Sequence, residues 1–291
     1  MMDMNYNKKT FCLFAGPVIV AFLMVVVIPL LIGVYYSFTE WNGRMDQVPN
    51  FIGFSNYIAI MKDEGFRNAF LFTAKFTVVS VIAINTIGFS LALLVTKKLK
   101  ISNFMRTIFF MPNLIGGLIL GFIWQFIFMG VFQTIGEITG WTFFQGWLAD
   151  ANTGFWGLVI IMVWQMSGYL MIIYIAALQN IPKSLLEAAD IDGANGWTKT
   201  RHIIFPMVAP AFTISMFLTL ANSFKLFDQN LSLTNGGPGG ATEMLALNIY
   251  KTAYTFTNYG AAQAKAVVFF LLVASITMVQ VYVNKKKEVE M

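Results

Sequence analysis

Long apolar runs of membrane-spanning length, separated by short polar loops, constrain this chain more than any other feature. The hydrocarbon core of a bilayer requires about 20 consecutive apolar residues of α-helix. Six such runs extend over residues 11–36, 69–95, 107–129, 155–179, 207–227 and 262–283. We therefore predict an all-α integral membrane protein with six transmembrane helices.

The composition excludes a water-soluble fold. Hydrophobic residues make up 57% of the chain and charged residues 11%, and the mean hydropathy is +0.68. The first run is longer than the apolar region of a signal peptide and lacks a small-x-small cleavage site, so we interpret it as a permanent helix. Pro17 and Pro29 are tolerable there, because neighbouring groups in a membrane protein can satisfy the freed backbone. The single Cys12 excludes an internal disulfide, and we predict no metal site.

Lys and Arg residues in short loops predict the orientation of the chain, because such loops resist translocation. In a six-span arrangement one side carries Lys8, Lys9, Lys97, Lys98, Lys100, Arg106, Lys183, Lys199, Arg201, Lys285, Lys286 and Lys287. That side is expected to be cytoplasmic, with both termini inside the cell. The net charge of +5 is then a signal of topology and not of nucleic-acid binding, since the basic residues lie at helix ends.

An ordered polar segment, EAADIDGANGWTKTRHIIFP, lies on this cytoplasmic side between the fourth and fifth runs. After Pro182, the pair Ser184 and Glu187 predicts a capping box at the start of a short helix. Gly193 is placed to end that helix, and a second helical stretch is expected over 197–204. A docking surface for a soluble partner is favoured by an apolar side with small residues, and a plain connector is the alternative. This side consists of Leu185, Leu186, Ala188, Ala189 and Ala194.

The same segment resembles the EAA loop of importer permeases of the ATP-binding cassette superfamily. The resemblance consists of Glu187-Ala188-Ala189, Gly193 four residues later, and Ile203 followed by Phe205-Pro206. The segment FIGFSNY at 51–57 and the segment LTNGGPGGAT at 233–242 resemble outer-loop signatures of the sugar-importer branch. The second of these is similar to the first of the two permease subunits in maltose-type and oligosaccharide-type systems.

The resemblance implies a type I importer permease architecture in a bacterial cytoplasmic membrane. The loop helix is then expected to dock on a cytoplasmic ATPase dimer through Glu187, Ala188, Ala189, Asp192, Gly193, Ile203 and Pro206. The expected partners also include a second homologous permease subunit, an extracellular sugar-binding protein, the sugar and membrane lipid. This chain would catalyse no reaction and hold no cofactor, with ATP and Mg on the ATPase. Independently, the sequence lacks a G-x-x-x-x-G-K-[ST] phosphate loop.

The domain organisation that we predict has three parts. Residues 1–66 form an N-terminal transmembrane helix and the first outer loop. Residues 67–284 form the permease core, which contains the loop at 182–206, and residues 285–291 form a basic cytoplasmic tail.

Polar residues within the fourth and fifth runs predict a path for a sugar, because such groups are costly when they face lipid. The predicted path residues are Trp164, Gln165, Tyr169, Thr219, Asn222, Ser223 and Asp228. The resemblance itself contributes Gln165, Met166, Tyr169 and Ser223. Hydrogen bonding between packed helices is the alternative role. Lys225 and Asp228 have a spacing that allows pairing on one helix face, whereas Lys75 and Lys265 are expected to snorkel to the interface.

The loop residues Gly236, Gly237 and Pro238 predict a tight outer turn. The resemblance implies that this turn contacts the extracellular binding protein, and a plain connector is the alternative. A secondary transporter or channel is the competing function, but we find no convincing internal repeat and few carboxylates for ion coupling. A membrane scaffold leaves the polar residues of the fourth and fifth runs unexplained. The sugar-importer branch suggests an α-linked oligosaccharide.

Overall fold

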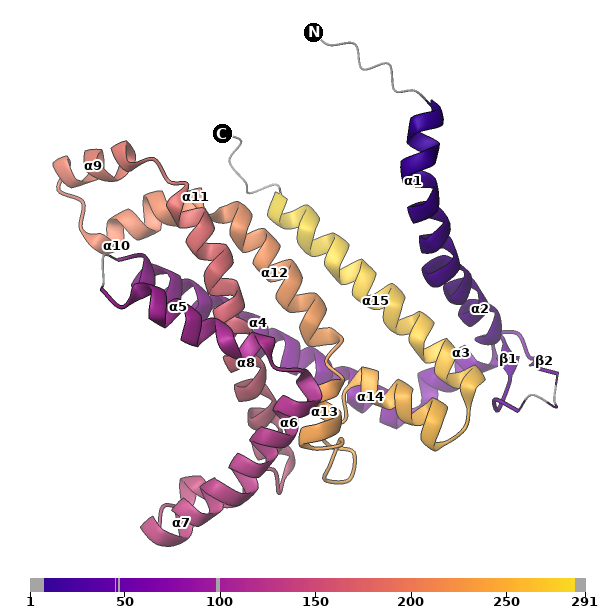
Figure 1. Cartoon of the computed structure of the whole chain (residues 1–291). Helices are drawn as coiled ribbons and strands as arrows, with labels where there is room; N and C mark the ends of the chain where they lie inside the picture. Colours follow the sequence, from indigo (N-terminus) through magenta and orange to yellow (C-terminus); the bar gives the residue numbers. More distant parts are fainter. Residues whose placement is uncertain (1–7, 45, 47, 98–99, 286–291) are drawn as a thin grey trace. The chain divides into compact units, whose positions relative to one another are not determined.

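The computed structural model describes residues 8–44, 46, 48–97 and 100–285, which are mostly helical (Figure 1). Residues 286–291 of the predicted basic tail lie outside this range, as do Lys98, Lys286 and Lys287 among the predicted cytoplasmic cations. The elements in chain order are α1 (Lys8–Phe22), a π-helical turn (Leu23–Val27), α2 (Ile28–Tyr36), β1 (Thr39–Glu40), β2 (Asn50–Phe51), α3 (Ser55–Lys62), α4 (Glu64–Thr96), α5 (Ser102–Phe110), a 3₁₀ turn (Met111–Leu114), α6 (Gly117–Phe126), a π-helical turn (Ile127–Phe132), α7 (Gln133–Thr139), a 3₁₀ turn (Thr142–Phe144), α8 (Ala151–Gln179), α9 (Lys183–Ile191), α10 (Gly196–Lys199), a π-helical turn (Thr200–Ile204), α11 (Phe205–Met207), α12 (Ala209–Phe224), α13 (Asp228–Leu233), α14 (Leu245–Tyr250), a π-helical turn (Lys251–Thr255) and α15 (Tyr259–Lys285).

Within the described residues, five helical segments are long and apolar enough to cross a membrane. They cover Leu13–Tyr36, Glu64–Thr96, Gly117–Thr139, Ala151–Gln179 and Tyr259–Val283. A sixth span results if Gly196–Met207 and Ala209–Phe224, which are bent by 71° at their junction, are counted together. The prediction of six spans is therefore confirmed, with the fifth one bent.

The first span contains both of its prolines without a break in the helix. Pro17 lies inside α1, and Pro29 lies in the first turn of α2. Directly before Pro29, the N–H of Ile28 donates to the carbonyl of Leu23, so the chain there forms a π-helical turn. Such a turn changes which carbonyls are paired where a proline lacks an N–H, and the helix continues.

The third span begins and ends later in the chain than the sequence predicts. The prediction of 107–129 is wrong, because the spanning segment covers Gly117–Thr139. Pro112 lies at the start of the 3₁₀ turn Met111–Leu114, and Gly116 is extended with ψ at 139°, so the chain breaks before α6. At the other end the π-helical turn prolongs the helix until Gly140, whose φ of 72° is left-handed. Glycine adopts this left-handed conformation readily, which explains why the segment ends at Gly140.

The chain forms two compact units, and their residue ranges differ from those of the three predicted parts. The first consists of residues 1–63 and 249–270, and the second of 64–248 and 271–291. Helix α15 contributes to both units. The three-part division that the sequence suggests stays a prediction.

A hairpin organises the first unit. Strands β1 and β2 are antiparallel, with Thr39 opposite Phe51. Asn56 donates through its side-chain amide to the carbonyls of Ser37 and Thr39, both at 2.9 Å. Tyr57 shares a hydrogen bond of 2.6 Å with the hydroxyl of Ser37. The FIGFSNY segment thus has a structural role, since its Asn56 and Tyr57 connect α3 to the start of the hairpin.

Lys265 in the first unit does not snorkel, so that expectation is wrong. Its Nζ lies 2.7 Å from Oδ2 of Asp63, and its side chain is 7% exposed. The same Nζ donates to the hydroxyl of Thr252 at 3.0 Å. A carboxylate and a hydroxyl within the protein replace the solvent that the cation was expected to reach. Lys75 in the second unit is exposed and lies over the ring of Phe155, with Nζ 4.5 Å from the ring centroid.

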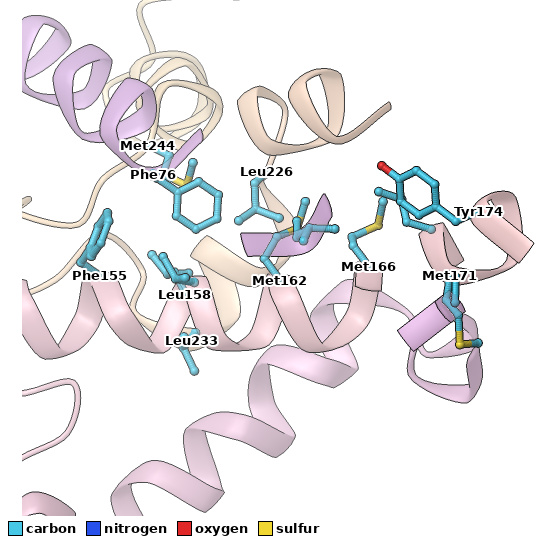
Figure 2. Close-up of a cluster of buried hydrophobic side chains, with 14 of the residues drawn as sticks. Phe76, Phe155, Leu158, Met162, Met166, Met171, Tyr174, Leu226, Leu233 and Met244 are labelled. Atoms are coloured by element: carbon cyan, nitrogen blue, oxygen red, sulfur yellow. The ribbon is translucent and has the colours of Figure 1, made fainter. Parts of the chain in front are cut away.

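Helix α8 is the centre of the second unit. Its buried side chains include Phe155, Leu158 and Met162, against which Phe76 of α4 packs (Figure 2). Gly168 permits close contact with α5, because a Cβ there would collide with the carbonyl oxygen of Phe109. This apolar packing gives the second unit a fixed frame for the polar groups described below.

Asn85 ties three helices of this unit together. Its Oδ1 accepts from the hydroxyl of Tyr174 on α8 at 2.6 Å, and its Nδ2 donates to the hydroxyl of Thr219 on α12 at 3.1 Å. The hydroxyl of Thr219 in turn donates to the carbonyl of Ser215 at 2.8 Å. The side chains of Asn85, Tyr174 and Thr219 are all buried. A buried polar network whose members are paired holds α4, α8 and α12 in one register.

The bend before α12 has a proline on each side. Pro206 lies within α11, Pro210 lies in the first turn of α12, and Val208 between them is fully buried. Proline removes a backbone donor, so Pro210 donates no helical hydrogen bond across the bend, and Val208 leaves the helical conformation with ψ at 5°. The 71° bend follows from this pair, and it directs the α9–α10 segment away from the axis of α12 (Figure 1).

Candidate functional site

A pocket of about 380 Å³ lies in the second unit, beside the end of α12. It is lined by Gly117, Met162, Gln165, Met166, Asn222, Lys225, Leu226, Phe227, Asp228 and Gln229. These residues come from α6, α8, α12, α13 and the turn between the last two helices. Of the predicted path residues, the structure brings Gln165, Asn222 and Asp228 together here, and it adds Met166, to which the resemblance points.

Two glutamine side chains connect the walls of the pocket. Gln165 on α8 donates through Nε2 to the carbonyl of Ile115 at 3.0 Å. Its Oε1 accepts from Nε2 of Gln229 on α13 at 2.5 Å. Gln229 is not among the residues predicted from the sequence. The run Asp228-Gln229-Asn230 directly after the fifth apolar segment was the only available signal.

Lys225 and Asp228 place one cation and one anion at the pocket, but they do not pair as expected. Helix α12 ends at Phe224, and Lys225 leaves the helical conformation with ψ at 8°. Because Asp228 begins a new helix, the two residues do not share one helix face. The described residues include no ion pair between them. Both side chains are exposed, so the charges are available at the mouth of the pocket.

The other predicted path residues lie outside the pocket. Thr219 is buried in the three-helix network, and Ser223 is fully buried, with no hydrogen-bond partner for its hydroxyl among the described residues. Trp164 is exposed and packs edge-on against Trp124 at 5.4 Å between ring centroids. Tyr169 is half-buried and packs against the core. Thr219 fits the alternative role, which is hydrogen bonding between packed helices.

The α9–α10 segment, residues 183–207, forms a preorganised pair of helices. The capping-box prediction is wrong, because α9 begins one residue after Pro182 and Ser184 lies inside its first turn. No side-chain hydrogen bond caps this helix. The extended Pro182, with ψ at 128°, fixes the chain entry instead, and a rigid residue at that point reduces the need for a side-chain cap.

The C-terminal end of α9 lies where the sequence predicts it. Gly193 is left-handed with φ at 74°, as expected for a C′ glycine. Nζ of Lys199 then bridges to Oδ1 of Asp190 at 2.5 Å and connects α10 to α9. Asn195 caps α10, since its side-chain oxygen accepts from the N–H of Thr198 at 2.9 Å. The second helical stretch is confirmed over Gly196–Met207, with a π-helical turn inside it.

The exposed side of this segment carries an apolar stripe. Leu185, Ala188 and Ile191 follow one face of α9, and the side chain of Ile191 is 87% exposed. Trp197 on α10 is 72% exposed. Ala189, expected on the docking face with Ala188, is buried in the chain itself. Among the remaining loop residues that we predicted, Glu187, Asp192 and Pro206 are exposed, and Ile203 is half-buried.

The glycine-proline loop is a tight turn held from beneath by two buried side chains. Asn230 accepts from the N–H of Met244 at 3.0 Å and donates to the carbonyl of Thr242 at 2.8 Å. The hydroxyl of Thr242 donates to the carbonyl of Gly237 at 2.6 Å. Of the three predicted contact residues, Pro238 is exposed, Gly237 is half-buried and Gly236 is buried with φ at 77°. The turn is confirmed, and the sequence analysis missed the anchors Asn230 and Thr242.

Comparison with known proteins agrees with this arrangement. The model of one family, the binding-protein-dependent transport system inner membrane component, matches residues 84–289. The chain belongs to this family, so it is a membrane transport subunit and not an enzyme. It is 56% identical over 285 residues to the probable starch degradation products transport system permease protein AmyD of Thermoanaerobacterium thermosulfurigenes, covering 98% of this chain and 97% of that protein.

More distant relatives extend the same picture. The chain is 30% identical to the multiple sugar-binding transport system permease protein MsmF of Streptococcus mutans, over 90% of each protein. Its fold is similar to a chain of a bacterial ABC transporter involved in the import of the acidic polysaccharide alginate, with a TM-score of 0.81, 19% identity and 96% of each chain covered. The prediction of a type I ABC importer permease fold is therefore confirmed.

Proposed function

We propose that this chain is one of two permease subunits of an ATP-driven importer that carries a neutral oligosaccharide into the cell. A second, homologous permease completes the transmembrane path. A cytoplasmic ATPase dimer drives the cycle, and an extracellular binding protein delivers the sugar. Both termini of the chain lie in the cytoplasm, on the side where its loop cations gather.

The course of α12 is the observation that carries this proposal. The helix begins at the bend that joins it to the α9–α10 segment, and its last turn lines the pocket through Asn222. Its 16 residues correspond to about 24 Å. The hydrogen bond between Thr219 and Asn85 fixes α12 to α4 between those ends. A displacement of the α9–α10 segment is therefore transmitted along one helix to the pocket.

The α9–α10 segment has the features of a docking surface for the ATPase. Leu185, Ile191 and Trp197 are large apolar side chains exposed in a polar loop, and exposed apolar patches of this kind mark protein–protein contacts. The ion pair between Lys199 and Asp190 holds the two helices in one arrangement before any partner binds. Preorganisation lowers the entropic cost of docking.

The chemistry of the pocket supports a neutral sugar. One cation, Lys225, and one anion, Asp228, balance each other, and the remaining polar lining consists of side-chain amides. Amides donate to and accept from sugar hydroxyls, and Met162 and Met166 offer apolar surface to the C–H face of a sugar ring. A relative at 56% identity is named for the transport of starch degradation products. An α-linked glucose oligosaccharide is therefore the substrate that we propose.

Reconstitution in liposomes tests the proposal. The complex of this chain with its second permease and ATPase, supplied with the binding protein, should accumulate labelled maltotriose only when ATP is present on the ATPase side. The chain alone should bind no ATP and transport no sugar. Uptake by the pure chain without ATP would instead support a secondary transporter or channel.

A further inference from the structure

The hydrogen bonds around Gln165 determine the orientation of Gln229. The carbonyl of Ile115 can only accept, so the group of Gln165 that faces it must be the Nε2 donor. Oε1 of Gln165 therefore faces Gln229. The group of Gln229 that meets this oxygen, at 2.5 Å, must in turn be its Nε2. A backbone carbonyl thus fixes the orientation of both amides, which an isolated glutamine side chain would leave open.

This chain of hydrogen bonds leaves one acceptor unused. Oε1 of Gln229 is buried and has no hydrogen-bond partner among the described residues. The residue as a whole is 1% exposed, yet it belongs to the wall of the pocket. A buried acceptor without a donor is costly, and such groups in native proteins require an explanation.

We propose that Gln229 recognises the substrate, with its free Oε1 accepting a hydrogen bond from one hydroxyl of the sugar. The inference rests on the proposed function and identifies a residue within that site. A sugar hydroxyl seated against this wall supplies the missing donor. A ring with hydrogen in place of that hydroxyl leaves Oε1 unpaired, so the site discriminates between the two. Gln165 acts as the positioning residue, because it turns Gln229 so that an acceptor and not a donor remains free.

Single-deoxy analogues of maltotriose test this assignment in the reconstituted complex. For each analogue, the ratio of its ATP-driven uptake to that of maltotriose is measured with the wild type and with Gln229→Met, which keeps the volume and removes the acceptor. The discrimination by the binding protein is the same in both complexes, so it cancels. For one analogue the wild type should discriminate about tenfold more strongly than the variant.

Gln125→Met is the matched control. Gln125 on α6 also anchors α13, since its Nε2 donates to the carbonyl of Leu233 at 3.0 Å, but it does not line the pocket. This variant should keep the discrimination of the wild type. If Gln229→Met fails to assemble, Gln165→Met decides. Without its positioning partner Gln229 can turn, and discrimination at the same hydroxyl should weaken.

The outcomes separate this inference from the function on which it rests. Suppose that the wild type accumulates maltotriose and that the uptake ratio of every deoxy analogue is unchanged in Gln229→Met, or in Gln165→Met where the first does not assemble. Gln229 then recognises no hydroxyl, although the importer assignment stands. If the wild-type complex takes up no maltotriose with ATP, the proposed function fails, and the role of Gln229 fails with it. Equal loss of discrimination in Gln125→Met would also overturn the inference, since packing of α13 would then explain the effect.

Discussion

The N–H of Ala194 donates to the carbonyl of Ala189 at 2.9 Å, across the left-handed Gly193. The N–H of Gly193 donates to the carbonyl of Asp190 at 3.1 Å. Together these bonds form a Schellman motif, which ends α9 and turns the chain into α10. The angle between the two helices of the proposed docking surface therefore depends on one residue that can adopt positive φ.

Substitution of Gly193 should separate backbone conformation from side-chain contact. Gly193→Val should destabilise the turn by about 1–2 kcal/mol, because a residue with a Cβ is strained in the left-handed region. Gly193→Asn should be tolerated far better, since asparagine adopts this region more readily. Retention of the ATPase by the tagged complex should fall for the valine variant and persist for the asparagine variant. Equal retention in both would show that the turn does not control docking.

The ion pair between the buried Lys265 and the partly exposed Asp63 should be costly to break from one side. Lys265→Met removes the cation beside Asp63, and Asp63→Asn removes the anion beside Lys265, whose side chain is 7% exposed. Each should lower the stability of the detergent-solubilised protein by about 2 kcal/mol, because solvent reaches Asp63 and reduces the cost below that of a fully buried pair. The double variant should recover much of this loss, because neither charge then remains at the site. Thermal unfolding of all four proteins gives the coupling. Additive losses would mean that the two groups act independently.

Asp150 should make the start of α8 sensitive to acid. The N–H groups of Thr153 and Asn152 donate to its carboxylate and hold the pKa of Asp150 below its usual value of 3.8. A lowered pKa in the folded state adds stability above the unfolded value, and this stability is lost as the pH falls through the folded value. Wild type should therefore unfold at a higher temperature than Asp150→Asn at pH 7. The difference should shrink as the pH falls below 3.8 and disappear once the pH is below the lowered pKa of the folded protein. A difference that is independent of pH would contradict this role.

Accessible cysteines should report the orientation of the chain. In a Cys12→Ala background, Ala241→Cys places a thiol on the exposed glycine-proline loop, and Ser184→Cys places one on exposed α9. An impermeant maleimide should label intact cells through Ala241→Cys only. After the cells are opened, both variants should react. The reverse pattern in intact cells would invert the topology that the loop cations predict.

The sequence predicts best those features that depend on local chemistry. Gly193 could be placed at the end of α9 because a left-handed turn favours glycine whatever surrounds it. The long apolar runs likewise report the bilayer directly. The third span was misplaced because Gly116 and Pro112 lie within an apolar run, and hydropathy alone does not register a break there.

Features that depend on tertiary partners could not be read from the sequence. Lys265 lies near the start of an apolar run, as a snorkelling residue would, and only the fold brings Asp63 to it. Thr219 and Asn222 are close neighbours on α12, but the helix turns one into the core and the other into the pocket. Gln229 follows the span and acquires its role only through Gln165, far away in the sequence.

Bulk on the exposed face of α9 tests most directly whether the α9–α10 segment couples ATP hydrolysis to transport. Ala188→Trp places a large ring on the stripe formed with Leu185 and Ile191. Ala151→Trp places the same bulk on an exposed alanine at the start of α8 and is the matched control. Both activities, ATP hydrolysis stimulated by the loaded binding protein and maltotriose uptake, are measured in liposomes that hold the whole complex. The proposed coupling predicts that Ala188→Trp loses both activities and its bound ATPase while the permease pair remains assembled, and that Ala151→Trp retains both. Normal hydrolysis and uptake in Ala188→Trp would contradict it.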